Sequence, residues 1–206
     1  MNLKTLVSEH QQAFKEKVLR ALAAKTKHSA SSTEQSSTEQ SSTEQSSTEQ
    51  SSTEQEQVAE KYGEVVERYV QEKYKGVEQA VSKILEFKRP VVLSIRRDPC
   101  SEEVCRICER DQPKIEELRR LYGDKIGFYE IFDSSPEAAL YHILHRGGGK
   151  GKGEGEKLLP LTAVIHNGEV KKYWSGRPVE VEEYRKYLDL PDCQTILSTN
   201  NLMKEK

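Results

Sequence analysis

The strongest constraint on how this chain can fold is a run of residues that cannot help to build a core. Residues 31–55 are five consecutive copies of Ser-Ser-Thr-Glu-Gln, which contain no apolar side chain and carry five negative charges. Such a segment cannot bury enough apolar surface to offset the entropy that is lost on ordering. We therefore expect residues 31–55 to form a disordered linker, with folded parts of the chain on either side.

The charge of the chain argues against a nucleic-acid partner. The formal net charge is −2, and the five glutamates of the repeat account for −5, which leaves +3 for all other residues. A nucleic-acid-binding domain would be expected to show a clustered basic face. We therefore expect no nucleic acid among the partners of this protein.

The N-terminus and the hydropathy pattern predict a cytoplasmic protein. Residues 1–10 lack the continuous apolar stretch of a signal peptide. The sequence has no run of 18 or more apolar residues, so we expect no transmembrane segment. Four cysteines are also too few for a disulfide scaffold in a chain of 206 residues.

Two amphipathic helices are predicted, one on each side of the repeat. Residues 1–30 and residues 56–87 both carry apolar side chains at helical spacing, although Gly63 and Gly76 weaken the second pattern and Gly76 could mark a break. Each apolar stripe must pack against something. The first helix could pair with the second, or mediate self-association or partner binding through residues 1–27, and its basic polar face is also compatible with a membrane surface.

Residues 88–190 alternate between strand-like and helical patterns, and residues 191–206 form a C-terminal tail. The predicted elements are a strand at 91–95, a helix at 105–121, a strand at 126–132, a helix opened by Ser135 and Pro136, strands at 161–166 and 169–174, and a helix at 180–188. Asn167-Gly168 is typical of a hairpin turn, because both residues accept a positive φ. The order β-α-β-α-β-β-α predicts an α/β domain whose first two strands lie parallel, with the hairpin at one edge.

The residues that carry chemistry in this domain are Cys105 and Cys108. They form a Cys-x-x-Cys pair where the first strand gives way to the first helix. Two thiols at this spacing indicate either a redox dithiol or half of a metal site. A helix N-terminus stabilises a thiolate through its unpaired N–H groups and its positive dipole end, which makes the first cysteine a nucleophile. The position therefore favours a redox dithiol.

The cysteines also allow a metal-binding alternative. Cys100, Cys105 and Cys108 have the C-x4-C-x2-C spacing of a ferredoxin-type cluster, and Cys193 would complete four thiolates for iron–sulfur or zinc. Cys193 lies 85 residues beyond Cys108, however, and helical geometry would splay Cys105 and Cys108. We therefore expect no metal and no other cofactor, and keep the metal site as an alternative.

The order of the elements and the position of the dithiol resemble the thioredoxin family. In that family a proline lies in the active-site helix five residues after the second cysteine, as Pro113 does after Cys108. A second proline, cis and facing the dithiol, lies seven residues before the Asn of an Asn-Gly hairpin, as Pro160 does before Asn167. The resemblance covers about residues 90–188 and implies a thioredoxin-like fold for this part of the chain.

The resemblance also implies thiol–disulfide exchange with protein disulfides. Cys105 would attack a substrate disulfide as a thiolate, and Cys108 would resolve the mixed disulfide. Leu159 and Pro160 would border the substrate groove, and an unidentified reductase would recycle the dithiol. A binding module with the same fold and no catalytic activity is the second alternative.

The sequence departs from the family pattern near the dithiol. Val104 stands where the family usually has Trp, and Arg106-Ile107 stands where it usually has Gly-Pro. The strand over residues 90–95 has no equivalent of the buried acid that moves protons in the family. An insertion over residues 96–103 adds Cys100, a candidate third redox cysteine that could exchange disulfides with Cys105. These departures bear on the redox potential more than on the fold.

Overall fold

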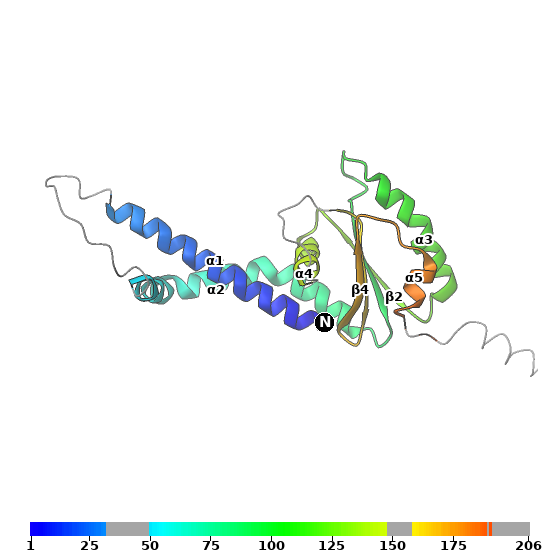
Figure 1. Ribbon diagram of the computed structural model, residues 1–206, viewed down its shortest axis with the longest axis horizontal. Coiled ribbons are helices and arrows are strands. Elements are labelled where there is room, and N and C mark those ends of the chain that lie inside the picture. The colour runs from blue at the N-terminus through cyan, green and yellow to red at the C-terminus, as the bar shows by residue number, and fades with distance from the viewer. Residues whose placement is uncertain (32–49, 148–157, 189, 191–206) are drawn as a thin grey trace, which may run out of the picture. The chain divides into compact units, whose positions relative to one another are not determined.

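The computed structural model of the protein describes residues 1–31, 50–147, 158–188 and 190 (Figure 1). Most of the predicted linker and the whole predicted tail lie outside these residues. The chain divides into two compact units. We call Met1–Leu6 with Val77–Lys206 the sheet unit, and Val7–Gly76 the helical unit, and describe each by itself.

The helical unit pairs two long helices. These are parts of α1 (Leu3–Ser31) and α2 (Gln50–Glu86). The ring of Phe14 on α1 lies 5.9 Å from that of Tyr74 on α2, and Lys15 forms an ion pair with Glu67. The apolar stripe of α2 is buried in this unit, at Val66, Val70 and Tyr74. The first helix therefore packs on the second, which is one of the arrangements that the sequence left open.

Helix α2 differs in two respects from the helix predicted at 56–87. It begins at Gln50, so the last copy of the Ser-Ser-Thr-Glu-Gln repeat belongs to the helix. It also continues through Gly63 and Gly76, so the break considered at Gly76 does not occur. Each glycine costs a helix about 1 kcal/mol relative to alanine, and the burial of Val77, Ala80 and Ile84 after Gly76 offsets that cost.

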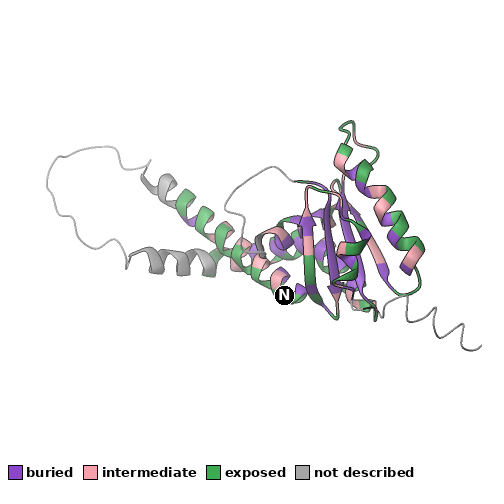
Figure 2. Ribbon diagram, turned by 45° about the vertical axis from the view of Figure 1, so that its right-hand side comes forward, coloured by how far each residue is buried: buried purple, intermediate pink, exposed green. Residues whose placement is uncertain are grey.

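The sheet unit is built on a four-stranded mixed sheet with the strand order β2-β1-β3-β4. The strands are β1 (Val91–Arg96), β2 (Gly127–Phe132), β3 (Leu161–His166) and β4 (Glu169–Ser175). As predicted, β1 and β2 are parallel and β3 and β4 form an antiparallel hairpin at the edge. Strand β3 also pairs antiparallel with β1. The two central strands are buried along almost their whole length, which is typical of a sheet covered on both faces (Figure 2).

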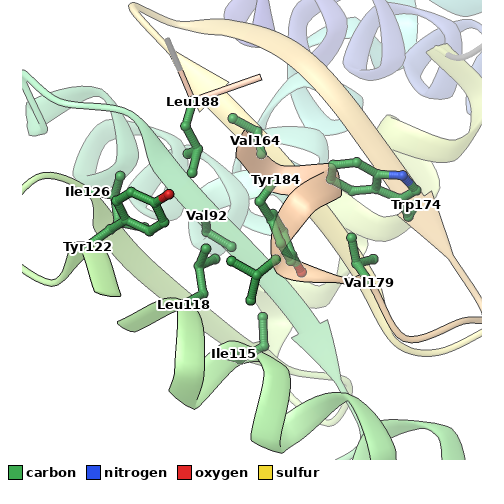
Figure 3. Packing of buried hydrophobic residues seen from close by; sticks show 11 residues of the cluster. Val92, Ile115, Leu118, Tyr122, Ile126, Val164, Trp174, Val179, Tyr184 and Leu188 are labelled. Atoms are coloured by element: carbon green, nitrogen blue, oxygen red, sulfur yellow. The ribbon is translucent and has the colours of Figure 1, made fainter. Parts of the chain in front are cut away.

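Helices of the sheet unit cover both faces of this sheet (Figure 1). Helix α3 (Arg106–Tyr122) and helix α5 (Val181–Arg185) pack on one face through a buried cluster drawn in Figure 3. Helix α4 (Leu140–Gly147) lies on the other face. Over residues 91–185 the predicted order β-α-β-α-β-β-α is confirmed, and the fold class of this part is α/β.

Two of the predicted helices differ from the structure at their ends. The segment after Ser135 begins with a 3-10 turn, Pro136–Ala139, before α4 starts. Ser135 stands at the N-cap, but its hydroxyl donates to the carbonyl of Phe132 and does not cap the turn. The last predicted helix, 180–188, is an α-helix only over Val181–Arg185.

The edge of the sheet beyond β4 is extended by the first residues of the chain. Leu3 donates its N–H to the carbonyl of Gly168 at 2.8 Å, and Val170 donates to the carbonyl of Met1 at 2.7 Å. The hairpin turn has φ of 52° at Asn167 and 75° at Gly168, as expected for Asn-Gly. The N-terminus of α1 is thus anchored to the sheet unit.

Candidate functional site

The dithiol lies at the N-terminus of α3. Cys105 is the N-cap residue, with an extended backbone, and Cys108 lies in the first turn. The two residues form a disulfide with their Cα atoms 5.2 Å apart. The backbone N–H of Cys108 also points at the Sγ of Cys105, at 3.2 Å. A thiolate on Cys105 would therefore be stabilised by a hydrogen-bond donor and by the helix dipole.

The two cysteines differ in their exposure to solvent. Cys108 is buried, with 5% of its surface exposed, whereas Cys105 is half-buried. Both cysteines line one pocket, and Cys105 is the more accessible of the two to an incoming molecule. This asymmetry is what a pair needs in which one sulfur attacks and the other resolves.

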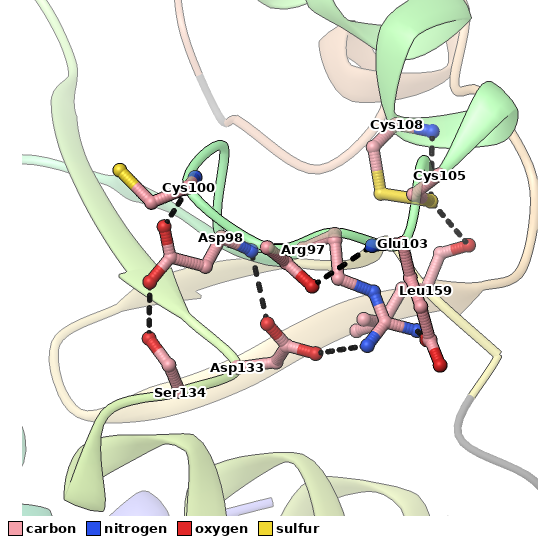
Figure 4. A network of polar contacts seen from close by, with 10 residues as sticks. Arg97, Asp98, Cys100, Glu103, Cys105, Cys108, Asp133, Ser134 and Leu159 are labelled. Atoms are coloured by element: carbon pink, nitrogen blue, oxygen red, sulfur yellow. Dashed lines mark hydrogen bonds and ion pairs between the residues drawn. A yellow bond between two sulfur atoms is a disulfide. The ribbon is translucent and has the colours of Figure 1, made fainter.

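Leu159 and Pro160 lie opposite the dithiol. The peptide bond between them is cis, and the carbonyl oxygen of Leu159 lies 3.9 Å from the Sγ of Cys105 (Figure 4). In the disulfide this sulfur carries no proton, so we treat the approach as a contact and not as a hydrogen bond. The structure thus brings together Cys105, Cys108 and the Leu159–Pro160 segment.

Side chains from two other elements hold the segment before Pro160 in place. The hydroxyl of Tyr141, on α4, accepts the N–H of Leu158 at 2.8 Å. The hydroxyl of Ser175, at the end of β4, donates to the carbonyl of Leu158 at 2.8 Å. Gly176 donates its N–H to the carbonyl of Pro160 at 2.9 Å. Sequence reasoning did not identify Tyr141 or Ser175, because their partner is distant in the chain and is a backbone group.

The insertion between β1 and α3 is tied to the end of β2 by polar contacts (Figure 4). Asp133 accepts the N–H of Asp98 at 2.9 Å and pairs with Arg97 at 3.0 Å. The Asp98 carboxyl accepts hydrogen bonds from the hydroxyl of Ser134 and from the N–H of Cys100. Both hydrogen bonds lower the pKa of Asp98. These contacts anchor the loop, and its residues line the same pocket as Cys105.

Cys100 lies in this loop as an exposed free thiol. Figure 4 shows its sulfur on the far side of Asp98 from Cys105, and the backbone N–H of Cys100 is held by Asp98 at 2.8 Å. The structure thus places the dithiol and the candidate third redox cysteine apart. Exchange between Cys100 and Cys105 would require the anchored loop to move.

A buried arginine lies against the first turn of α3. Arg96, the last residue of β1, donates from Nη2 to the carbonyl of Cys108 at 2.7 Å. Its Nη1 donates to the side chain of Gln112 and pairs with Glu130 at 3.1 Å. Arg96 and both cysteines line one pocket of about 430 Å³. The sequence pattern assigns Arg96 to the insertion over residues 96–103, whereas the structure makes it the buried last residue of β1.

A buried carboxyl is also present, on α3 and not on the preceding strand β1. Asp111 is fully buried on α3, one turn after Cys108, and accepts the N–H of Val179 at 3.1 Å. Burial raises its pKa, and the hydrogen bond from Val179 lowers it by less. The sequence alone indicates this burial, because Asp111 lies on the same helical face as three apolar or buried residues: Cys108, Ile115 and Leu118.

The described residues provide no set of ligands for the metal-binding alternative. Among residues 1–31, 50–147, 158–188 and 190, no group of three or more His, Cys, Asp or Glu side chains could hold a metal ion. Cys193, the fourth ligand of that hypothesis, lies outside the described residues.

Solved structures, two of them described as thioredoxins, are similar to about half of this chain. One is a thioredoxin-2 described as a component of the malaria parasite protein secretion machinery, with 14% identity, 47% of this chain and 77% of that chain covered, and a TM-score of 0.33. Another is thioredoxin O2 from Arabidopsis thaliana in the oxidised state, with 17% identity, 53% and 80% covered, and a TM-score of 0.36. A third is described only as a malarial protein, with 15% identity, 48% and 98% covered, and a TM-score of 0.36.

Comparisons of sequence give no match. No protein-family model matches the chain, and no curated protein matches it. Within the described part of the chain, no helix is long and apolar enough to cross a membrane.

Proposed function

We propose that this protein is a thiol–disulfide oxidoreductase that reduces or exchanges protein disulfides through Cys105 and Cys108. The observation that carries the proposal is the placement of Cys105. It is the half-buried N-cap of α3, with the N–H of Cys108 at 3.2 Å and the carbonyl of Leu159 at 3.9 Å from its sulfur. A sulfur in such a place is accessible, and its thiolate is stabilised.

The reaction starts from the reduced pair. The Cys105 thiolate attacks one sulfur of a substrate disulfide, and a mixed disulfide forms as the other substrate sulfur leaves as a thiolate. Cys108 loses its proton and attacks the Cys105 sulfur. The Cys105–Cys108 disulfide forms, and the second substrate thiolate is released. The substrate gains two electrons, and a reductase must return two electrons to the pair for the next cycle.

A substrate polypeptide would lie beside Leu159 and Pro160, both of which are buried in the free protein. The N–H and carbonyl of Leu158 and the carbonyl of Pro160 are already engaged by Tyr141, Ser175 and Gly176. We propose that an extended substrate pairs with the backbone of Leu159, beside the sulfur of Cys105. A protein disulfide in a flexible segment fits this arrangement. We further propose that the protein acts in the cytoplasm.

Catalysed reduction of insulin by dithiothreitol tests the activity. We expect the wild-type protein to accelerate the precipitation of insulin chains, and Cys105→Ser to abolish the acceleration. Cys100→Ser is the matched control, because it removes the free thiol of the loop and leaves the pair intact. Equal rates for the wild type and Cys105→Ser would remove the proposal.

Trapping of substrates is the second test. In Cys108→Ser the mixed disulfide on Cys105 cannot be resolved, so we expect it to accumulate as a species of higher mass on non-reducing gels. The species should disappear on addition of dithiothreitol and should not form in the Cys105→Ser, Cys108→Ser double variant.

A further inference from the structure

Arg96 is a buried charged residue beside the dithiol that the mechanism above does not use. Its side chain is 9% exposed, whereas that of its ion-pair partner Glu130 is 41% exposed. Solvent screens a half-exposed carboxylate more strongly than a buried guanidinium. The pair therefore leaves a net positive potential on the buried side, where the first turn of α3 lies.

The guanidinium is close enough to act on the sulfurs. Its Nη2 lies 2.7 Å from the carbonyl oxygen of Cys108. Bond lengths limit the Sγ of a cysteine to about 5 Å from its own carbonyl oxygen, so this nitrogen lies within roughly 8 Å of the Cys108 sulfur. The Cys105 sulfur is bonded to that sulfur in the disulfide and so lies in the same neighbourhood. Charges at this separation still interact appreciably in a partly buried site.

Other charged groups face the same pocket. Arg97 is already paired with Glu103 at 3.1 Å and with Asp133 at 3.0 Å. The remaining ionisable side chains that line the pocket are acidic and oppose a thiolate: Asp98, Glu103, Glu109 and Glu130. Asp111 lies on the buried side of α3. Of the two arginines that line the pocket, Arg96 pairs with one carboxylate and Arg97 with two, so the charge of Arg96 is the less cancelled. Arg106 and Arg110 on α3 are also cations near the dithiol, but both are exposed to solvent, which screens their charge.

We propose that Arg96, partly neutralised by Glu130, stabilises the thiolate form of the reduced dithiol and so raises the reduction potential of the Cys105–Cys108 pair. Reduction breaks the S–S bond and takes up two electrons and one proton, which gives a thiolate on Cys105 and a thiol on Cys108. A nearby cation stabilises this product and leaves the neutral disulfide almost unaffected. The inference rests on the proposed function only in requiring that the pair be redox-active.

Two measurements on the full-length protein test the inference. The thiol pKa of Cys105 is obtained from the pH dependence of its alkylation by iodoacetamide, followed by mass spectrometry of the Cys105 peptide. The reduction potential is obtained by equilibration with glutathione buffers at a pH above the thiol pKa of every variant. Because the two sulfurs titrate as a coupled pair, the first pKa of the pair is the quantity compared.

Arg96→Gln should raise this pKa by about one unit. It should also shift the equilibrium about tenfold toward the disulfide, which lowers the potential by about 30 mV. Arg96→Lys, which keeps the charge, should retain most of the wild-type value. Glu130→Gln should act in the opposite direction and lower the thiol pKa, because it removes the anion that partly cancels Arg96.

Arg89→Gln is the charge-matched control, because it removes a cation at the opposite end of β1. It should leave both quantities unchanged. If Arg96 only supports the helix, Arg96→Gln will lower the melting temperature and leave the thiol pKa unchanged, which overturns the inference. If Arg96→Gln does not fold, Glu130→Gln decides, and an unchanged or higher thiol pKa in that variant overturns it. If the wild-type protein does not accelerate insulin reduction, this result counts against the proposed function and not against the inference about Arg96.

Discussion

Asp111 combines full burial with a carboxyl group, and this makes it a source of pH-dependent stability. Its Oδ1 accepts the N–H of Val179, whereas Oδ2 has no hydrogen-bond partner among the described residues. Burial raises the pKa of Asp111 above its ordinary value of 3.8. The folded state therefore favours the protonated form, and its stability falls as the pH rises from about 3.8 through the raised pKa.

We predict that Asp111→Asn removes this loss. Asparagine keeps an oxygen for the N–H of Val179 and cannot ionise, so the variant should be more stable than the wild type at pH 7 and similar to it at pH 4. Urea denaturation between pH 4 and 8 measures the difference. Asp111→Ala is the contrasting variant, because it leaves the Val179 N–H unpaired and should cost about 1–3 kcal/mol. A wild-type slope that persists in Asp111→Asn would show that another group titrates.

Gly176 occupies a backbone conformation that only glycine accepts readily. Its φ is 71°, and a Cβ at this position would lie 2.9 Å from the Cβ of Leu158. We predict that Gly176→Ala destabilises the protein by about 1–3 kcal/mol. It should also slow insulin reduction, because the segment that leads to Pro160 must shift. Thermal unfolding and the insulin assay measure the two effects.

Gly63 gives the matched control for this substitution. It lies inside α2, where an added Cβ has no neighbour within 4 Å. Gly63→Ala should therefore stabilise the helix by about 1 kcal/mol, because alanine loses less backbone entropy than glycine. Its activity in the insulin assay should equal that of the wild type. Destabilisation by both substitutions would contradict the explanation based on local geometry.

At the scale of elements, the parts of the fold that were predictable are those fixed by short-range chemistry. The Asn167-Gly168 turn, the helix start at Cys105 and the alternation of strands and helices depend on a few neighbouring residues each. The hairpin and the parallel pairing followed from them. Helix α5 ends at Arg185, earlier than its pattern indicated, although Val181, Tyr184 and Leu188 are at helical spacing and are all buried in the cluster that includes α3.

The parts of the site that were not predictable depend on pairs of residues far apart in the sequence. Arg96 gains its role from Glu130 and from the carbonyl of Cys108. Tyr141 acts on the backbone of Leu158, 17 residues later. No local pattern marks an arginine that will be buried or a tyrosine that will hold a loop. Asp111 is different, since its place on the buried stripe of α3 could have been read from helical spacing.

At the scale of the whole molecule, the boundaries between the two compact units fall inside helices: one in α1, after Leu6, and one in α2, after Gly76. Residues 1–6 belong to the sheet unit, and the following part of α1 belongs to the helical unit. Leu3 is fully buried and is hydrogen-bonded to Gly168, so the start of the chain contributes to the sheet. Val70 is buried in the helical unit, on α2. These two residues allow the stability of each unit to be perturbed separately.

We predict that Leu3→Ala lowers the stability of the sheet unit by about 2–4 kcal/mol, because it empties a fully buried site. Val70→Ala should lower that of the helical unit by about 1–2 kcal/mol. Hydrogen exchange followed by mass spectrometry measures each effect by region. In Leu3→Ala, amides around Val170 should exchange faster while those of residues 60–75 stay protected, and Val70→Ala should give the reverse. If each unit has its own stability, each must open in a separate reaction, and exchange then accelerates in one region only. Equal acceleration of exchange in both regions for either variant would show that the two units unfold as one cooperative body.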